Sequence, residues 1–163
     1  MKLVIYQKNR RVNQDGFTLI EILLVVFIIA VLAAIALPRL GASSETAREN
    51  ADIATGHQLK SALDRYQIEN GRYPKIDEAK INDGKLEMED FIPQYISKLD
   101  VSTTQQNTDA DNRGFGIGTL EDGLIPEDNP TNLIMLYLTG DGSAAEVRVY
   151  NGELDKVLWS SLN

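Results

Sequence analysis

The sequence predicts an α+β protein in which one long N-terminal helix packs against a small antiparallel sheet of three or four strands. Three features support this class. An apolar run covers residues 17–37, a helical stripe of apolar residues follows over 45–70, and short strand-like segments separated by glycine turns occupy the C-terminal part. At about 1.5 Å per residue, a helix over the apolar run would cross the roughly 30 Å hydrocarbon core of a bilayer.

The segment before the apolar run, residues 1–16, is polar and carries more basic than acidic side chains. Basic residues that precede a membrane span stay on the cytoplasmic side, so we expect the rest of the chain to be translocated. An ordinary secretory signal is the main alternative. Its apolar core is usually about 7–15 residues, shorter than 17–37, and Leu40 puts a bulky side chain where a signal peptidase requires a small one.

The apolar run contains one unexpected residue, Glu21. A carboxylate inside a membrane helix costs roughly 2.5–3.5 kcal/mol on insertion scales, so such a residue usually has a partner and a function. No basic residue lies within the run, so we expect the partner to come from elsewhere. A free α-amino group at Phe17 would supply it if the chain were cut after Gly16.

Gly16 and the sequence FTLIE at residues 17–21 resemble the processing motif of type IV pilins and type II secretion pseudopilins. In that family a membrane peptidase cuts after the glycine and methylates the new N-terminal residue, here Phe17. The glutamate, here Glu21, then neutralises the N-terminus of a neighbouring subunit as the helices bundle. The resemblance implies a type IV pilin-like fold in which Thr18 and Glu21 serve assembly.

The resemblance also implies partners and a location. It makes the chain a subunit of a helical homo-oligomeric filament whose partners are the prepilin peptidase, an inner-membrane assembly platform and minor pilins or pseudopilins. It implies a single-pass protein of the bacterial inner membrane with a cytoplasmic N-terminus and an extracytoplasmic C-terminus, later part of a periplasmic or surface filament. Both a pseudopilin and a type IV pilin fit. The alternative function is a signal-anchored extracytoplasmic binding domain that does not polymerise.

Pro38 closes the apolar run, because proline removes one backbone N–H and clashes with the carbonyl one turn earlier. The resemblance implies that the helix can unwind here in a filament, and a simple kink is the alternative. We expect an amphipathic continuation of the helix over 38–71, with Asp52 on its polar face and an Asn-Gly cap at residues 70–71.

Residues 72–163 form the expected globular extracytoplasmic head. A short helix is predicted within residues 86–96, limited by Pro93. Glycine turns at residues 140–142 and 151–152 predict two consecutive hairpins. The four strand candidates are residues 115–120, 133–138, 146–150 and 156–159. One face of this sheet must cover the helix stripe, because an isolated hairpin is only marginally stable in water.

The composition argues against an enzyme and against nucleic-acid binding by this subunit alone. The chain has no cysteine and one histidine, His57, and it carries no nucleophile motif or phosphate loop. Its net charge of −8 repels phosphate backbones. Without cysteine the fold cannot rely on disulfides, although an extracytoplasmic location would permit them.

Calcium is the one cofactor that the sequence suggests. Asn107, Asp109 and Asp111 place oxygen atoms at alternating positions before Gly114, an arrangement suited to a hard cation. The segment does not match an EF-hand, because Arg113 occupies a would-be ligand position. Major pseudopilins have a calcium site in their C-terminal loops, so the resemblance points the same way. A solvated polar loop is the alternative.

Overall fold

A computed structural model describes residues 16–121, 123–125 and 130–162 of the chain. By contacts the chain divides into a first unit, residues 1–41, and a second unit, residues 42–163. The first unit contains the beginning of the long helix. The second unit contains the rest of that helix and both sheets. Apart from Gly16, the predicted leader lies outside the described residues.

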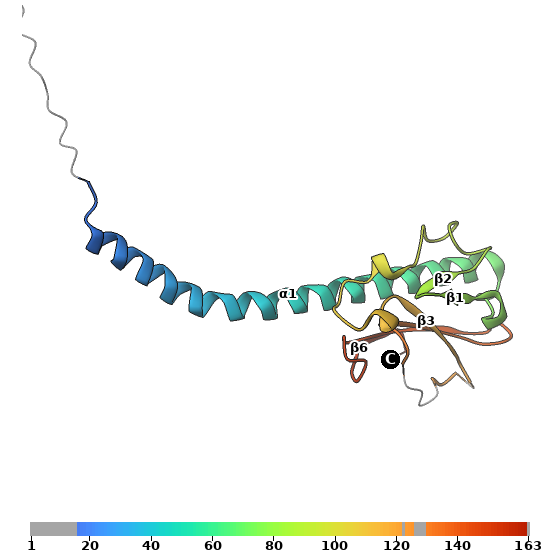
Figure 1. Cartoon of the computed structure of the whole chain (residues 1–163). Coiled ribbons are helices and arrows are strands. Elements are labelled where there is room, and N and C mark those ends of the chain that lie inside the picture. The colour runs from blue at the N-terminus through green and yellow to red at the C-terminus, as the bar shows by residue number, and fades with distance from the viewer. Residues whose placement is uncertain (1–15, 122, 126–129, 163) are drawn as a thin grey trace, which may run out of the picture. The chain divides into compact units, whose positions relative to one another are not determined.

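Helix α1 (Leu19–Asn70) includes both the apolar run and the amphipathic stripe (Figure 1). Residues 38–41 are helical although they include Pro38, so this single chain keeps its helix where unwinding is expected in a filament. The end of α1 is as predicted. Gly71 adopts a φ of 75° and donates its N–H to the Gln67 carbonyl at 2.8 Å, which is a left-handed glycine cap.

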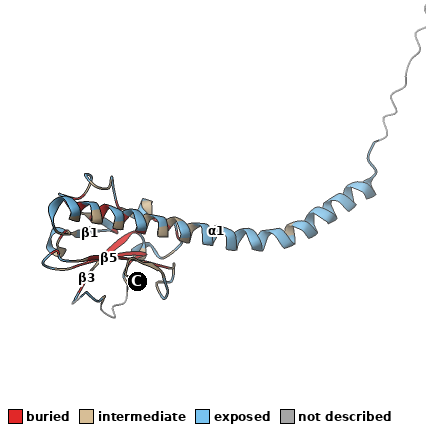
Figure 2. Cartoon of the chain, turned by 180° about the vertical axis from the view of Figure 1, so that it is seen from behind, coloured by how far each residue is buried: buried red, intermediate tan, exposed pale blue. Residues whose placement is uncertain are grey.

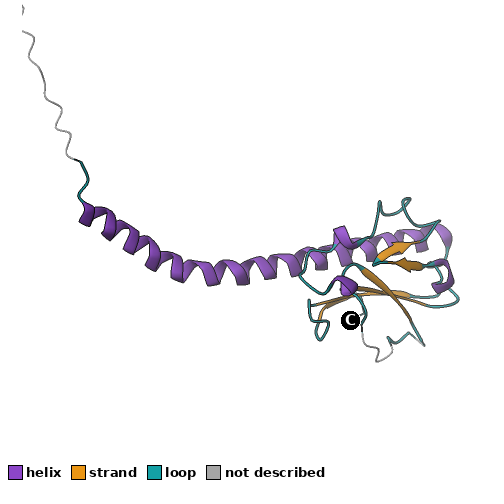
Figure 3. Cartoon of the chain, in the orientation of Figure 1, coloured by secondary structure: helices purple, strands orange, loops and turns teal. Residues whose placement is uncertain are grey.

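The four-stranded sheet has the strand order β3-β4-β5-β6. Figure 3 draws the strands in orange. Its members are β3 (Phe115–Thr119), β4 (Ile134–Leu138), β5 (Ala145–Tyr150) and β6 (Val157–Ser160), each within a residue of its predicted bounds. The pairs β4–β5 and β5–β6 are antiparallel, which confirms the two predicted hairpins.

Strands β3 and β4 pair in parallel, with Phe115 opposite Ile134, so the sheet is mixed and the prediction of a wholly antiparallel sheet is wrong. The physical reason lies in the connection. A parallel pair needs a long crossover that brings the chain back to the starting end of the first strand, and the segment between β3 and β4 is long enough to do this.

A second, two-stranded sheet pairs β1 (Lys80–Asn82) with β2 (Lys85–Glu87) in an antiparallel ribbon. The helix predicted within residues 86–96 is wrong, because β2 occupies its start and turns follow. Asp83 and Gly84, both at positive φ, form the tight turn that favours a hairpin here. The described part of the second unit also contains three short 3-10 helices, η1 (Ile76–Glu78), η2 (Val101–Thr103) and η3 (Ala110–Asn112).

The hydrophobic core lies between the second-unit part of α1 and the face of the four-stranded sheet that meets it (Figure 2). Leu59 and Leu63 of α1 are fully buried, as are Leu136 of β4 and Val147 of β5. Each buried leucine or valine stabilises the fold by about 1.5–3 kcal/mol relative to an exposed one. A long helix packed on a small sheet confirms the predicted α+β class.

Candidate functional site

Thr18 and Glu21 close the first turn of α1. The Thr18 hydroxyl accepts a hydrogen bond from the Glu21 backbone N–H at 3.3 Å. In return, Glu21 Oε2 accepts hydrogen bonds from the Thr18 backbone N–H and from Thr18 Oγ1, each at 2.7 Å. This reciprocal arrangement is a capping box, which satisfies two of the N–H groups that have no partner within a helix at its N-terminus.

The capping box gives Glu21 a first partner from within its own chain, which the sequence analysis missed. The signal was present, since threonine followed three residues later by glutamate is the signature of this cap. The box uses only one carboxylate oxygen. Among the residues that the structure describes, nothing donates a hydrogen bond to Glu21 Oε1 and no cation forms an ion pair with Glu21. One oxygen is therefore free to accept from a donor outside this chain.

Around this cap the first unit exposes a continuous apolar surface. Phe17 and Leu19 are each 84 % exposed, and the large apolar side chains that follow are exposed as far as Leu40 (Figure 2). By length and composition α1 is long and apolar enough to cross a membrane. An exposed apolar surface of this extent marks contact with lipid or with another protein.

Gly16 and Phe17 precede the helix and are both exposed. A Cβ atom added at Gly16 would meet nothing within 4 Å among the described residues. The described part of the fold therefore leaves room for a side chain at this position. If glycine is required at this position, the requirement comes from a molecule that recognises the exposed peptide bond between Gly16 and Phe17.

Two of the three predicted calcium ligands line the same cavity of the second unit. Asn107 and Asp109 line an open polar cavity of the second unit, whose wall also includes Glu153, but Asp111 does not line it. Within the described part of the chain, no three His, Cys, Asp or Glu side chains are grouped so that they could hold a metal ion. The calcium site stays a prediction.

The single histidine has a structural neighbour. His57 is exposed on α1, and its ring centroid lies 4.2 Å from that of Trp159 on β6. His57 therefore packs against Trp159 at the edge of the core, where α1 passes over β6.

A family model described as the prokaryotic N-terminal methylation motif matches residues 11–37. This range contains Gly16, Phe17, the capping pair and most of the exposed apolar surface. The matched motif stands at the start of a long apolar helix that is followed by a small sheet, as the resemblance to pilins and pseudopilins implies. The resemblance inferred from residues 16–37 is confirmed.

Among named proteins, the chain is similar to type II secretion system core protein G. It is 38 % identical to that protein from Klebsiella michiganensis over 69 residues, which are 42 % of this chain and 49 % of the relative. For Pectobacterium carotovorum the identity is 40 % over 66 residues, or 40 % of this chain and 42 % of the relative. The chain thus matches about half the length of these relatives or less.

The chain is also similar to a pilus protein. It is 39 % identical over 72 residues to the type IV wide pilus major component PilA4 of Thermus thermophilus, covering 44 % of this chain and 55 % of that protein. No solved structure matches the chain significantly. The names of these relatives describe a core protein of a secretion system and a major component of a pilus.

Proposed function

We propose that the chain is a structural subunit of a pilus-like filament, either a type II secretion pseudopilin or a type IV pilin. One observation carries the proposal. The N-terminal methylation motif coincides with the capped start of an exposed apolar helix, and the acid of that cap keeps one carboxylate oxygen free.

Maturation is the first step of this function. A prepilin peptidase cuts the peptide bond between Gly16 and Phe17 and methylates the new amino group of Phe17. The exposed position of both residues supports access to this bond. Cleavage removes the basic leader and leaves an N-terminal ammonium group next to the capping pair of Thr18 and Glu21.

Assembly follows from the charges on this new terminus. When the apolar helices bundle, Glu21 enters an environment without water, and Oε1 accepts from the Phe17 ammonium group of a neighbouring copy. Removing one member of a buried ion pair costs about 3–5 kcal/mol, because the other charge is left without compensation. The pair therefore favours the register in which each Glu21 meets a neighbouring N-terminus. Pro38 marks the point where the helix can loosen in the bundle.

The proposal places the subunit in the bacterial inner membrane before assembly, with its N-terminus cytoplasmic and its head extracytoplasmic. The basic residues before the apolar run support this orientation. Its partners are then other copies of the chain, the prepilin peptidase, the assembly platform and minor pilins or pseudopilins. The filament that results is periplasmic or on the cell surface.

Mass spectrometry of the protein extracted from membranes tests the proposal. We expect a mature chain that begins at Phe17 and carries one added methyl group. A Gly16→Leu variant is the matched control, because the fold does not require glycine there, and it should remain uncleaved in the membrane. Recovery of the intact leader on the normal protein, in cells with an active prepilin peptidase, would instead support a signal-anchored domain and overturn the proposal.

A further inference from the structure

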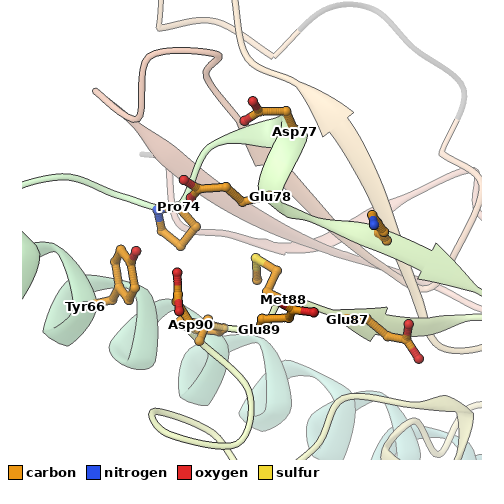
Figure 4. Close-up of a pocket in the computed structure, with 10 residues that line it drawn as sticks. Tyr66, Pro74, Asp77, Glu78, Glu87, Met88, Glu89 and Asp90 are labelled. Atoms are coloured by element: carbon orange, nitrogen blue, oxygen red, sulfur yellow. The ribbon is translucent and has the colours of Figure 1, made fainter.

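A cavity of about 310 Å³ lies in the second unit, beside the C-terminal end of α1 (Figure 4). Its walls come from α1, η1, the β1–β2 ribbon and the turn after β2. The lining residues are Tyr66, Pro74, Asp77, Glu78, Lys80, Glu87, Met88, Glu89, Asp90 and Phe91. Small-molecule sites begin at about this volume and combine an apolar wall with a few polar groups. Here the apolar and aromatic residues stand among six charged ones, so this wall is more strongly charged than that of a usual site.

One polar group in the wall lacks a partner. Tyr66 is only 4 % exposed, and its ring packs edge-on against Phe91 and Tyr95 at centroid distances of 5.9 and 5.2 Å. Its hydroxyl makes no hydrogen bond to any residue that the structure describes. In Figure 4 this hydroxyl points into the cavity, on the same side as the carboxylates of Glu78 and Asp90. Among the described residues, Arg148 Nε is the buried side-chain atom without a hydrogen-bond partner, so the Tyr66 oxygen is open to the cavity, where a ligand can bond to it.

The charge of the wall decides which kind of ligand fits the cavity. Glu78 is held by Arg72 at 2.7 Å and Glu87 by Lys85 at 2.6 Å. The other three carboxylates of the wall form no hydrogen bond or ion pair with described residues, and they belong to Asp77, Glu89 and Asp90. Lys80 is the one basic side chain in the lining. The cavity therefore carries excess negative charge and favours a cation.

The shape of the wall favours an organic cation over a metal ion. Among the described residues, no three His, Cys, Asp or Glu side chains are grouped so that they could hold a metal ion. Pro74, Met88 and Phe91 provide apolar surface for a hydrocarbon stem. A cationic head with several N–H groups can donate both to a carboxylate and to the Tyr66 hydroxyl.

We propose that this cavity binds an alkylguanidinium or alkylammonium group. The head donates to Asp90 and to the Tyr66 hydroxyl, and the stem lies against Met88 and Phe91. Two sources offer this chemistry, namely an arginine or lysine side chain of a second copy of this chain and a free small amine. Binding by the cavity does not depend on the filament proposed above.

Binding is tested on the full chain in detergent micelles at low salt by amide chemical shifts in ¹H-¹⁵N NMR spectra. The probe is n-butylguanidinium, and n-butanol is the uncharged control of similar length. We expect saturable shifts around residues 66 and 87–91 with the guanidinium only. Equal shifts with butanol, or no shifts in this region with the guanidinium, would overturn the assignment.

Three variants separate the site from general electrostatic attraction. Tyr66→Phe keeps the ring packing and should bind the probe about three- to tenfold more weakly, because one hydrogen bond is lost. Asp90→Asn should weaken binding at least as much. Glu153→Gln removes the same charge away from the cavity and should leave binding unchanged. Wild-type affinity in Tyr66→Phe, or equal losses in Asp90→Asn and Glu153→Gln, would contradict the proposal.

A competition measurement on the same sample distinguishes the two sources of the group, a second copy of the chain and a free small amine. If a neighbouring copy supplies the group, saturating n-butylguanidinium should lower the sedimentation coefficient of associated protein, and n-butanol should not. If a free amine is the ligand, association should be unchanged while the NMR shifts persist. Both results support the same ligand chemistry. The outcome of the maturation test above is independent of these measurements, because probe binding requires neither cleavage nor a filament.

Discussion

Asp52 of α1 accepts two hydrogen bonds from Gln106, one from its backbone N–H at 3.1 Å and one from its side-chain amide at 3.0 Å. The Gln105 backbone N–H donates a third, at 2.6 Å. Asp52 is fully buried and forms no ion pair within the described part of the chain. Three donors therefore replace the water that a carboxylate loses on burial. They fasten the segment between η2 and η3 to the helix.

The first prediction is that Asp52→Ala strongly destabilises the second unit. The change leaves the two backbone N–H groups and the amide of Gln106 without this acceptor, and each buried unsatisfied group costs about 1–3 kcal/mol. We expect a loss of about 3 kcal/mol or more in the free energy of unfolding. Urea unfolding of the full chain in micelles, followed by Trp159 fluorescence, measures it. Glu49→Ala, one turn earlier on α1, should change stability by less than about 0.5 kcal/mol; equal effects would contradict the role of Asp52.

The second prediction separates the two roles of Glu21, which are to accept hydrogen bonds in the helix cap and to supply a negative charge in the filament. Glu21→Gln keeps a side-chain acceptor at the third helical position, which a capping box tolerates, but removes the charge. Glu21→Ala removes both. We expect both variants to be processed and inserted but to form few or no filaments, because the neighbouring ammonium group loses its counter-charge. Filament yield by shearing and electron microscopy is the measurement.

Thr18 supplies the control for this series. Thr18→Ala keeps the charge of Glu21 but removes the cap hydroxyl, which should cost the helix start about 1 kcal/mol and leave filaments present. Thr18→Ser keeps both the charge of Glu21 and the cap hydroxyl. Normal filament yield from Glu21→Gln would show that the charge is not needed, and the proposed pairing with Phe17 would then fail.

Periodic patterns made most of the fold predictable. The helix from the apolar run to Asn70 and the four strands of the larger sheet follow from side-chain periods and glycine turns, which are local properties of the sequence. The parallel pairing of β3 with β4 was missed because it depends on where a long connection returns, which no local pattern records. The strand β2 was missed because the apolar residues around Phe91 resemble a helical stripe, although Asp83 and Gly84 favoured a hairpin.

The candidate site was partly predictable. The motif at residues 16–21 was recognised from its residue types, but the same residues also carry the capping signature, which was overlooked. Asp52 was expected on the polar face of the helix and is instead buried. Its burial depends on donors from Gln105 and Gln106, more than fifty residues away along the chain, and the helical period cannot reveal them. The cavity at Tyr66 likewise needs elements that only the fold brings together.

The third prediction concerns acid stability at Asp100, which caps η2. Hydrogen bonds from the Ser102 hydroxyl and from Lys98, with a further one from the Ser102 backbone N–H, lower the pKa of Asp100 from 3.8 to about 2. Because the folded pKa lies below the unfolded one, this contribution to stability is present above pH 4 and is lost as the pH falls towards 2.

An NMR titration of the Asp100 carboxyl carbon measures this pKa directly. We expect a midpoint near 2 in the native chain. In Ser102→Ala the hydroxyl donor is gone, so the midpoint should rise towards the ordinary value. A native midpoint near 3.8, or no change in Ser102→Ala, would show that these hydrogen bonds do not persist in solution.

The fourth prediction compares two glycines of α1 that differ in their surroundings. A Cβ atom at Gly56 would lie 2.6 Å from Cγ2 of Val149, whereas at Gly41 it would meet nothing within 4 Å among the described residues. Alanine is about 1 kcal/mol more favourable than glycine inside a helix, so Gly41→Ala should not lower stability. Gly56→Ala should lower it by about 1–3 kcal/mol in urea unfolding, because overpacking forces the sheet away from the helix. A Gly56→Ala variant as stable as the native chain would mean that Val149 yields without cost, and the close approach of helix and sheet would then not constrain this position.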